Sequence, residues 1–210
     1  MEPVDGTLVL ADEQTEGRGR FGRAWRSDPG RGVWLTLLER PQDPAALDVL
    51  SIRVGLAAAQ ALDHAAGEEV GLKWPNDLLA RDGKLGGILV ESRWHGAALQ
   101  WVAIGVGVNV RRPIDASLGG AGLPAGTSRL ELLRRLVPAI RAAARRTGHL
   151  GAAELENYRY RDRGRGRRCR EPVAGQVAGI APDGALLVET QDGILPVRAG
   201  SLVFESQESA

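Results

Sequence analysis

The sequence predicts an α+β fold, in which a mixed β-sheet carries helices and a small β-rich part follows. Short apolar runs typical of strands occupy residues 7–11, 33–38, 70–74, 77–80, 84–92 and 99–110. One longer stretch, residues 45–66, instead carries apolar side chains at helical spacing. From residue 168 onward the chain changes to short strand-like pieces separated by turns. One long helix among many strands favours α+β over regular alternation of strands and helices.

Local signals place the ends of the first elements. We expect residues 7–11 to form a buried strand, and the prolines of residues 41–44 to end the second strand. Two of the later strands flank Pro75-Asn76, and residues 81–83 form a turn. Gly67 ends the long helix, whose apolar residues include Leu47, Leu50, Val54, Ala58 and Leu62.

A second helical region follows a glycine- and proline-rich segment, residues 111–126, that should be irregular. Ser128 is a candidate N-cap, and Glu131 three residues later would complete a capping box. This helix should run to about Arg146, with Pro138 kinking or splitting it. Its predicted apolar stripe comprises Leu130, Leu133, Val137 and Ile140.

The chain is long enough for one medium domain and a small appendage. Residues 152–158 should form a short helix at the end of a first domain, residues 1–160. The second domain, residues 161–210, should be a small β-barrel-like unit, with turns at residues 182–184 and 192–193.

Composition narrows the class of protein. With 43% hydrophobic and 25% charged residues among 210, the chain is typical of a soluble globular protein. A net charge of +1 gives no general electrostatic attraction to nucleic acid or membranes. No apolar run approaches the roughly 20 residues of a membrane span, and no signal peptide precedes residue 7. The single Cys169 cannot form an intrachain disulfide, which fits a reducing compartment, so we expect a cytoplasmic protein.

Two sets of residues suggest site chemistry that we do not adopt. Residues 159–170 hold seven arginines, which could bind nucleic acid, but a solvated interdomain linker is favoured because no row of aromatic residues accompanies them. The histidines, His64, His95 and His149, lack the spacing of a zinc site.

Residues 17–25 read Gly-Arg-Gly-Arg-Phe-Gly-Arg-Ala-Trp and form the first candidate site. Glycine lets the backbone approach a ligand closely, because it has no Cβ. Arginine supplies a permanently charged planar fork that suits carboxylate or phosphate. Trp25 adds a flat face that could stack on a base or close a pocket. We expect such a loop to order around an anion, although a solvated basic turn would look the same.

Residues 71–91 form the second candidate site. The chain has 25 arginines and two lysines, and both lysines, Lys73 and Lys84, lie in this segment. Lysine is a compact point charge that can sit beside a reacting phosphate or carboxylate without bidentate geometry. The placement supports a site without proving one.

These motifs together resemble a known family. Gln14 with residues 17–25, then residues 73–78, 84–91 and 105–109, resemble in that order the catalytic core of biotin protein ligases. The resemblance covers most of residues 7–110. It implies a fold like that of class II aminoacyl-tRNA synthetases, with an SH3-like β-barrel as the C-terminal domain. It also implies that biotin and ATP form biotinyl-5′-AMP, with Mg²⁺, and that the biotinyl group passes to a lysine of a biotin carboxyl carrier protein.

The resemblance also assigns roles to residues. Lys73, Arg18 and Arg20 would be catalytic and would bind both substrates. Biotin would further contact Gln14, Gly17, Gly19, Gly105 and Gly107, with its valeryl chain against Leu78 and Ile88. Trp25 and Asn109 would recognise adenine. Asp77 could orient Mg²⁺ or could cap the turn at Pro75-Asn76, and the residues do not decide between these. Trp34 and Trp74 are better explained as core.

Two departures from the family pattern matter. There is no room before residue 7 for a winged-helix DNA-binding domain, so we expect no DNA partner and no repressor role. Residues 1–6 also lack the Ser/Thr-Asn segment that grips the biotin ureido group in the family, which suggests a start upstream of Met1 or weak biotin binding. Three rivals therefore remain: a lipoate-type protein ligase, a degenerate paralogue that holds an adenylate or carrier, and an RNA-binding protein using residues 159–170. We expect a monomer or weak homodimer.

Overall fold

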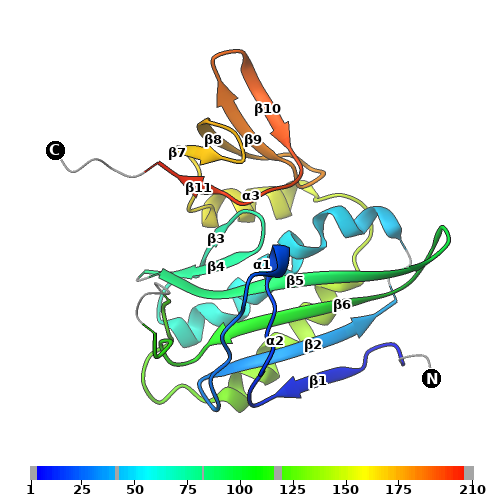
Figure 1. Cartoon of the computed structure of the whole chain (residues 1–210), viewed down its shortest axis with the longest axis vertical. Helices are drawn as coiled ribbons and strands as arrows, with labels where there is room; N and C mark the ends of the chain where they lie inside the picture. Colours follow the sequence, from blue (N-terminus) through cyan, green and yellow to red (C-terminus); the bar gives the residue numbers. More distant parts are fainter. Residues whose placement is uncertain (1–3, 41–42, 82, 116–119, 206–210) are drawn as a thin grey trace.

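The computed structural model describes residues 4–40, 43–81, 83–115 and 120–205. It has two antiparallel sheets, and in Figure 1 the smaller one lies above the larger one. The larger sheet has the strand order β1-β2-β6-β5-β4-β3, with β1 Leu8–Ala11, β2 Gly32–Glu39, β3 Gly71–Lys73, β4 Asp77–Ala80, β5 Gly83–His95 and β6 Ala98–Asn109. The smaller has the order β10-β9-β8-β7-β11, with β7 Arg168–Glu171, β8 Gly175–Ile180, β9 Leu186–Thr190, β10 Gly193–Val197 and β11 Val203–Phe204.

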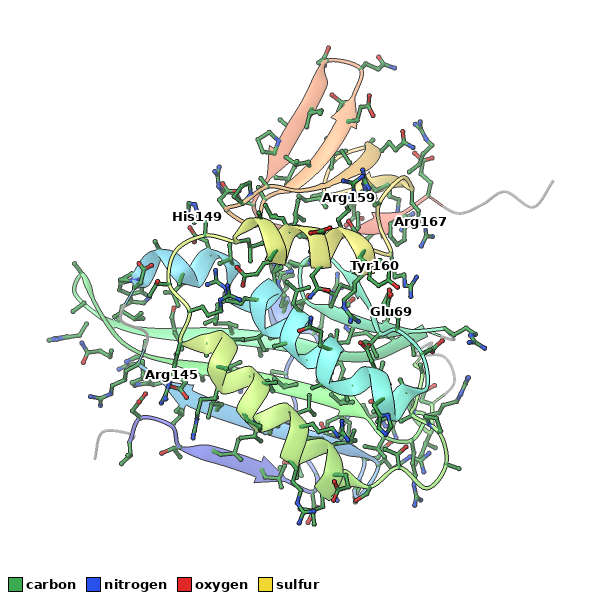
Figure 2. The ribbon with its side chains drawn as sticks, turned by 180° about the vertical axis from the view of Figure 1, so that it is seen from behind. Glu69, Arg145, His149, Arg159, Tyr160 and Arg167 are labelled. Carbon is green, nitrogen blue, oxygen red and sulfur yellow. The ribbon has the colours of Figure 1, made fainter. Side chains whose placement is uncertain are left out.

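Helices cover one face of the larger sheet and fill the space between the sheets. Helices α1 (Leu47–Ala66) and α2 (Arg129–Ala144) lie side by side across that face, as Figure 2 shows from behind. Helix α3 (Ala152–Arg161) connects this layer to the smaller sheet. Single 3₁₀ turns, η1 (Arg20–Gly22) and η2 (Pro44–Ala46), complete the regular elements of the described residues.

The α+β class is confirmed, but the mixed sheet is wrong: every pairing between the described strands is antiparallel. Short turns join β3 to β4, β4 to β5 and β5 to β6, and such turns give antiparallel neighbours. The long connection through α1 carries the chain from β2 to the far edge, so β3 never pairs with β2. The parallel contacts that exist are isolated bridges, Leu72 with Asp162 and Lys84 with Gly120.

Strand β1 forms where expected, but it is not buried. Leu8, Val9 and Leu10 are 39%, 55% and 46% exposed. The strand is at the sheet edge, where it pairs with β2 on one side, and its side chains are exposed on both faces of the sheet, since successive residues point to opposite faces. The apolar run therefore predicted the strand correctly and its burial wrongly.

Helix α2 departs from its prediction in three details. Its buried residues are Leu132, Leu136, Ile140 and the alanines 143 and 144, whereas Leu130 is 57% exposed. Leu133 and Val137 are only partly buried. Of the two alternatives at Pro138, a kink or a split, the split is wrong: the helix continues through it, and the Arg134 carbonyl that loses its partner belongs to an exposed residue. It ends at Ala144 rather than Arg146.

The predicted N-cap of α2, Ser128, is confirmed, but the capping box is only half formed. The Ser128 hydroxyl accepts a bond from the Glu131 N–H at 3.4 Å. The Glu131 carboxylate instead accepts from Arg134 Nη1 at 2.5 Å. The capping box is therefore not reciprocal. The expected turns at residues 41–44 and 81–83 and the expected irregular segment 111–126 include residues 41–42, 82 and 116–119, which lie outside the described residues.

Helix α1 is the core of the larger layer. With η2 it is long and apolar enough to cross a membrane, contrary to the expectation that no segment is. Most of it is buried inside the protein, where Val49, Leu50, Val54, Ala58 and Leu62 are at most 2% exposed. The helix carries apolar residues on several sides because it packs against neighbours on several sides, namely α2, α3, β3, β4 and β5. Gly67 ends the helix in the left-handed conformation (φ 67°), as predicted.

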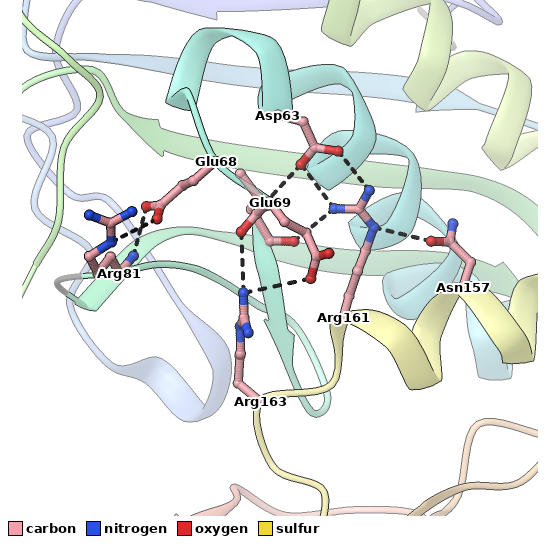
Figure 3. Close-up of polar contacts among 8 residues, drawn as sticks. Asp63, Glu68, Glu69, Arg81, Asn157, Arg161 and Arg163 are labelled. Atoms are coloured by element: carbon pink, nitrogen blue, oxygen red, sulfur yellow. Dashed lines mark hydrogen bonds and ion pairs between the residues drawn. The ribbon is translucent and has the colours of Figure 1, made fainter.

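The arginine-rich segment is solvated as predicted at six of its seven arginines, but its ends belong to α3 and β7, and one arginine is buried. Arg161 is 6% exposed and donates to both Asp63 carboxylate oxygens at 2.9 and 2.6 Å. It also donates to the Val70 carbonyl at 2.9 Å and to Asn157 at 3.1 Å (Figure 3). Arg163 follows, with its N–H bonded to the Leu72 carbonyl at 2.9 Å. These arginines fasten α3 to α1 and β3, through partners that lie far away in the sequence.

We expect Arg161→Met to lower the free energy of unfolding by about 3 kcal/mol, because it leaves Asp63 without its buried partner. Arg159→Met is the matched control: its side chain is exposed on the same helix, and its effect should stay within about 0.5 kcal/mol. Urea unfolding of both variants measures the difference. Equal effects would show that the Arg161 ion pair contributes nothing specific.

Candidate active site

Residues 17–25 form a small folded hairpin. The Trp25 N–H donates to the Gly17 carbonyl at 2.8 Å, and the Gly19 N–H donates to the Arg23 carbonyl at 2.8 Å. The tip turns at Phe21 and Gly22, which have φ of 56° and 70°. A Cβ on Gly17 would lie 2.3 Å from the Trp25 carbonyl oxygen, so glycine is needed there to close the hairpin.

A cavity of about 440 Å³ lies between this hairpin, the sheet and the second sheet. It brings together most of the predicted site residues: Gln14, Arg18, Gly19, Arg20, Trp25, Lys73, Asp77, Gly105 and Gly107, together with Ile88. Three others do not line it. Gly17 faces Trp25 as described, Leu78 is fully buried in the core, and Asn109 is 6% exposed. The Asn109 amide donates to the Lys84 carbonyl at 3.3 Å, which joins β6 to the start of β5.

Cationic residues outnumber acidic ones around the cavity. Its lining contains the cations Arg18, Arg20, Arg23, Lys73 and Lys84 and the acids Glu16, Asp77 and Glu91. Burial lowers the pKa of Lys73; the Asp77 carboxylate opposes this, while Lys84, Arg167 and Arg23 reinforce it. Asp77 is paired with Lys84 Nζ at 2.6 Å. An anion entering beside Lys73 would therefore meet concentrated, partly desolvated positive charge.

Arg20 links the hairpin to the second sheet. Its Nη1 donates to the Gly200 carbonyl at 3.0 Å, across 180 residues of sequence. Burial lowers the pKa of this guanidinium, and Asp77 partly compensates. The hairpin is therefore held over the cavity by a contact that no sequence signal indicated.

Trp25 lies flat against the sheet where Gly107 makes room for it. A Cβ on Gly107 would lie 2.8 Å from the indole ring. The Trp34 ring meets the Trp25 ring edge-on, with the two ring centroids 6.2 Å apart. Lys84 Nζ lies 5.2 Å from the centroid of the Trp25 ring. Both Trp25 and Trp34 line the cavity, and their buried N–H groups have no partner within the described part of the chain. They are donors that a ligand oxygen could satisfy.

The third tryptophan of the cavity lining, Trp74, and Gln14 are already hydrogen-bonded. Trp74 is 2% exposed, and its indole N–H donates to the Gly184 carbonyl at 3.0 Å; its core position is as predicted, although it also borders the cavity. The Gln14 side-chain oxygen accepts from the Ser27 hydroxyl at 2.7 Å. This bond leaves the Gln14 amide N–H₂ group as the donor for a ligand carbonyl.

Sequence reasoning missed two parts of the cavity wall. Trp34 was predicted to be a core residue. It is buried, at 3% exposure, but it also lines the cavity. Val203 of β11, with Ser201 and Leu202 just before it, forms another part of the cavity wall. A contact between residues so distant in sequence leaves no local pattern.

We expect Gly107→Ala to displace Trp25 and destabilise the protein by about 1–3 kcal/mol, the usual effect of overpacking. Trp25→Ala in the same chain should remove much of that penalty, because the clashing ring is gone. Thermal unfolding of the two single variants and the double variant measures the coupling. If the losses of stability in the two single variants simply add in the double variant, the penalty of Gly107→Ala does not come from a clash with Trp25.

An α+β fold that carries a cation-rich cavity fits an enzyme of the class that activates a carboxylate with a nucleotide. The chain belongs to the biotin/lipoate A/B protein ligase family, whose sequence profile matches residues 2–109.

Individual relatives agree with this assignment. The chain is 34% identical over 217 residues to the biotin–acetyl-CoA-carboxylase ligase of Mycobacterium tuberculosis, covering 95% of this chain and 79% of that protein. It is 41% identical over 112 residues to the bifunctional ligase/repressor BirA of Bacillus spizizenii, where the match covers 53% of this chain and about a third (34%) of the relative. The fold matches the biotin protein ligase of Aquifex aeolicus in complex with biotin and ATP, with a TM-score of 0.81 at 24% identity over 98% of this chain and 91% of that one.

Proposed function

We propose that the chain joins biotin to ATP and transfers the biotinyl group to a lysine of a biotin carboxyl carrier protein. The observation that carries the proposal is the cation-rich cavity around Lys73, in a chain of this family. In the first step a biotin carboxylate oxygen attacks the α-phosphorus, and the bond to the leaving pyrophosphate breaks. In the second step the lysine amine attacks the carbonyl of biotinyl-5′-AMP, loses a proton, and AMP leaves.

Both reactants of the first step are anions, so cations at the reacting centre matter most. Lys73 would neutralise the carboxylate and the α-phosphate as they approach. Arg18 and Arg20 would close over them and keep water from the acyl-adenylate. The contact from Arg20 to Gly200 supports a closed arrangement.

The remaining residues would recognise the two substrates. Gln14 would donate to the ureido carbonyl, with Gly19, Gly105 and Gly107 allowing close backbone approach. Ile88 would lie against the valeryl chain, and Trp25 and Trp34 would contact adenine, each with an unpaired N–H. The substrate contacts expected of Gly17, Leu78 and Asn109 are left out of the proposal, because these residues do not line the cavity.

Mg²⁺ belongs to the proposal as a companion of ATP. The described residues contain no cluster of three or more histidine, cysteine or acidic side chains. The one acid proposed for the metal, Asp77, is paired with Lys84. This set does not fit a resident metal site, and a magnesium ion arriving with ATP would be held mainly by phosphate oxygens and water.

We further propose a catalytic domain over residues 1–160 and an SH3-like domain over residues 161–210, in a cytoplasmic protein. Its partner would be a lysine-bearing carrier domain rather than DNA, and it would act as a monomer or weak homodimer. The RNA-binding alternative is disfavoured, because Arg161, Arg163 and Arg168 are engaged in ion pairs. The possible loss of the ureido grip concerns residues 1–6, of which 1–3 lie outside the described residues.

The direct test incubates the chain with labelled biotin, ATP, Mg²⁺ and a biotin carboxyl carrier domain. We expect label on the carrier lysine, dependent on ATP, and none on a carrier whose acceptor lysine is arginine. Lipoate tested in parallel separates the two ligase activities. Transfer of lipoate without biotin would overturn the substrate assignment, and transfer of neither would favour the non-catalytic paralogue.

A further inference from the structure

The second sheet brings an aromatic ring to the proposed catalytic lysine. Lys73 ends β3, and its Nζ lies 5.2 Å from the centre of the Phe204 ring on β11. The residues just before Phe204, from Ser201 to Val203, line the same cavity. Figure 1 shows β11 on the side of the second sheet that faces β3 and β4.

The position of this ring is fixed from two directions. The Arg167 guanidinium carbon lies 3.5 Å from the ring centre, which is stacking distance. Figure 2 labels Arg167 where the second sheet meets the rest of the molecule. Strand β11 pairs with β7, which starts one residue after Arg167, and its register shifts between Val203 and Phe204.

The charges around Lys73 explain why such a ring is useful. Asp77 on β4 attracts the ammonium, but it is shared with Lys84 on β5. Arg23 of the hairpin and Arg167 repel the ammonium, and burial removes its water. The negative face of an aromatic ring can stabilise a desolvated cation without adding a competing charge or a nucleophile.

We propose that Phe204, held by Arg167, is a positioning residue that keeps the Lys73 ammonium charged and aimed at the reacting anions. The inference rests on the proposed function for its kinetic consequence, but its structural part can be tested separately. It gives the second sheet a defined task in the first chemical step, through one side chain.

The test uses Phe204→Leu in the full chain, which keeps an apolar side chain and removes the ring. With biotin and ATP, pyrophosphate release at saturation should fall about tenfold while KM for biotin stays near that of the native chain, as expected for loss of a cation–π contact. Phe204→Tyr, which keeps a ring, should restore the rate. Ile194→Ser, at an exposed position of the same sheet, is the control and should change neither quantity.

The chain contains two lysines, so nitrogen-15 labelling of lysine gives two side-chain NMR signals, assigned with Lys84→Arg. In Phe204→Leu the titration midpoint of Lys73 should fall, because the cation loses the ring, and Phe204→Tyr should retain the native midpoint. An unchanged Lys73 midpoint in Phe204→Leu would overturn the proposal. Absence of biotin turnover by the native chain would refute the proposed function alone, since the titration does not depend on it.

Discussion

Lys73→Ala should slow formation of biotinyl-5′-AMP by about 10²–10³-fold, the usual effect of removing one preorganised electrostatic contact. Its effect on biotin affinity should be much smaller, because the cation acts where charge is rearranged between carboxylate and phosphate. Pyrophosphate release at saturating biotin and ATP measures the rate, and calorimetric titration measures the affinity. An unchanged rate would remove Lys73 from the mechanism.

The pH dependence of this step has a defined sign. Burial lowers the pKa of Lys73, so the ammonium is lost at lower pH than for an ordinary lysine. The rate should therefore decline on the alkaline side earlier than a solvent-exposed lysine would allow, and Lys73→Arg should shift that decline to higher pH because arginine stays charged. A rate with the same alkaline limb in both forms would assign the titration to another group.

Arg53→Met should cause the largest loss of stability, about 3–5 kcal/mol, because the buried Glu154 carboxylate keeps only the exposed Arg146 as an ion-pair partner and three carbonyls lose their donor. Arg53 is 2% exposed, and its Nε donates to Glu154 at 2.8 Å. It also donates to the carbonyls of Arg146, Gly148 and His149 at 3.2, 3.1 and 2.9 Å. This arginine therefore ties α1 to the start of α3 and to the segment before it. Urea unfolding of the variant against the native chain measures the loss.

A control and a pH dependence sharpen that prediction. Arg134→Met breaks an exposed pair with Glu131, with side chains 64% and 59% exposed, and should cost at most about 1 kcal/mol. Burial alone would raise the pKa of Glu154, but the Arg53 and Gly151 hydrogen bonds and the charges of Arg53 and Arg146 lower it overall. Its stabilising contribution is thus present above the ordinary glutamate pKa and is lost as pH falls through the depressed value. A native chain and an Arg53→Met chain that lose stability in parallel on acidification would contradict this.

Local signals predicted most of the elements, because periodicity, turns and caps are written in neighbouring residues. The long helix, its end at Gly67, and the strands around Pro75-Asn76 are where the sequence placed them. What failed depends on neighbours in space. An apolar strand proved to be an exposed edge, the stripe of α2 was rotated away from Leu130, and Arg161 was buried by Asp63, a partner 98 residues away.

The candidate site divides in the same way. Gln14, Arg18, Arg20 and Lys73 line one cavity, as predicted. They could be predicted because each belongs to a short motif with its own chemistry. The need for glycine at position 107 could not be predicted, because the Trp25 ring that would clash with a Cβ there is far away in the chain. Phe204 and Gly200 carried no motif at all, and only the docking of the second sheet brings them to Lys73 and Arg20.

The central claim is that the cavity around Lys73 forms an acyl-adenylate. Its most direct test is mass spectrometry of a single turnover, with the chain in excess over biotin, in the presence of ATP and Mg²⁺ and without any carrier protein. We predict that biotinyl-5′-AMP accumulates with the native chain, one pyrophosphate released for each, and that Lys73→Ala yields almost none in the same time. ATP cleavage that does not require biotin, or equal biotinyl-5′-AMP from both chains, would contradict the account.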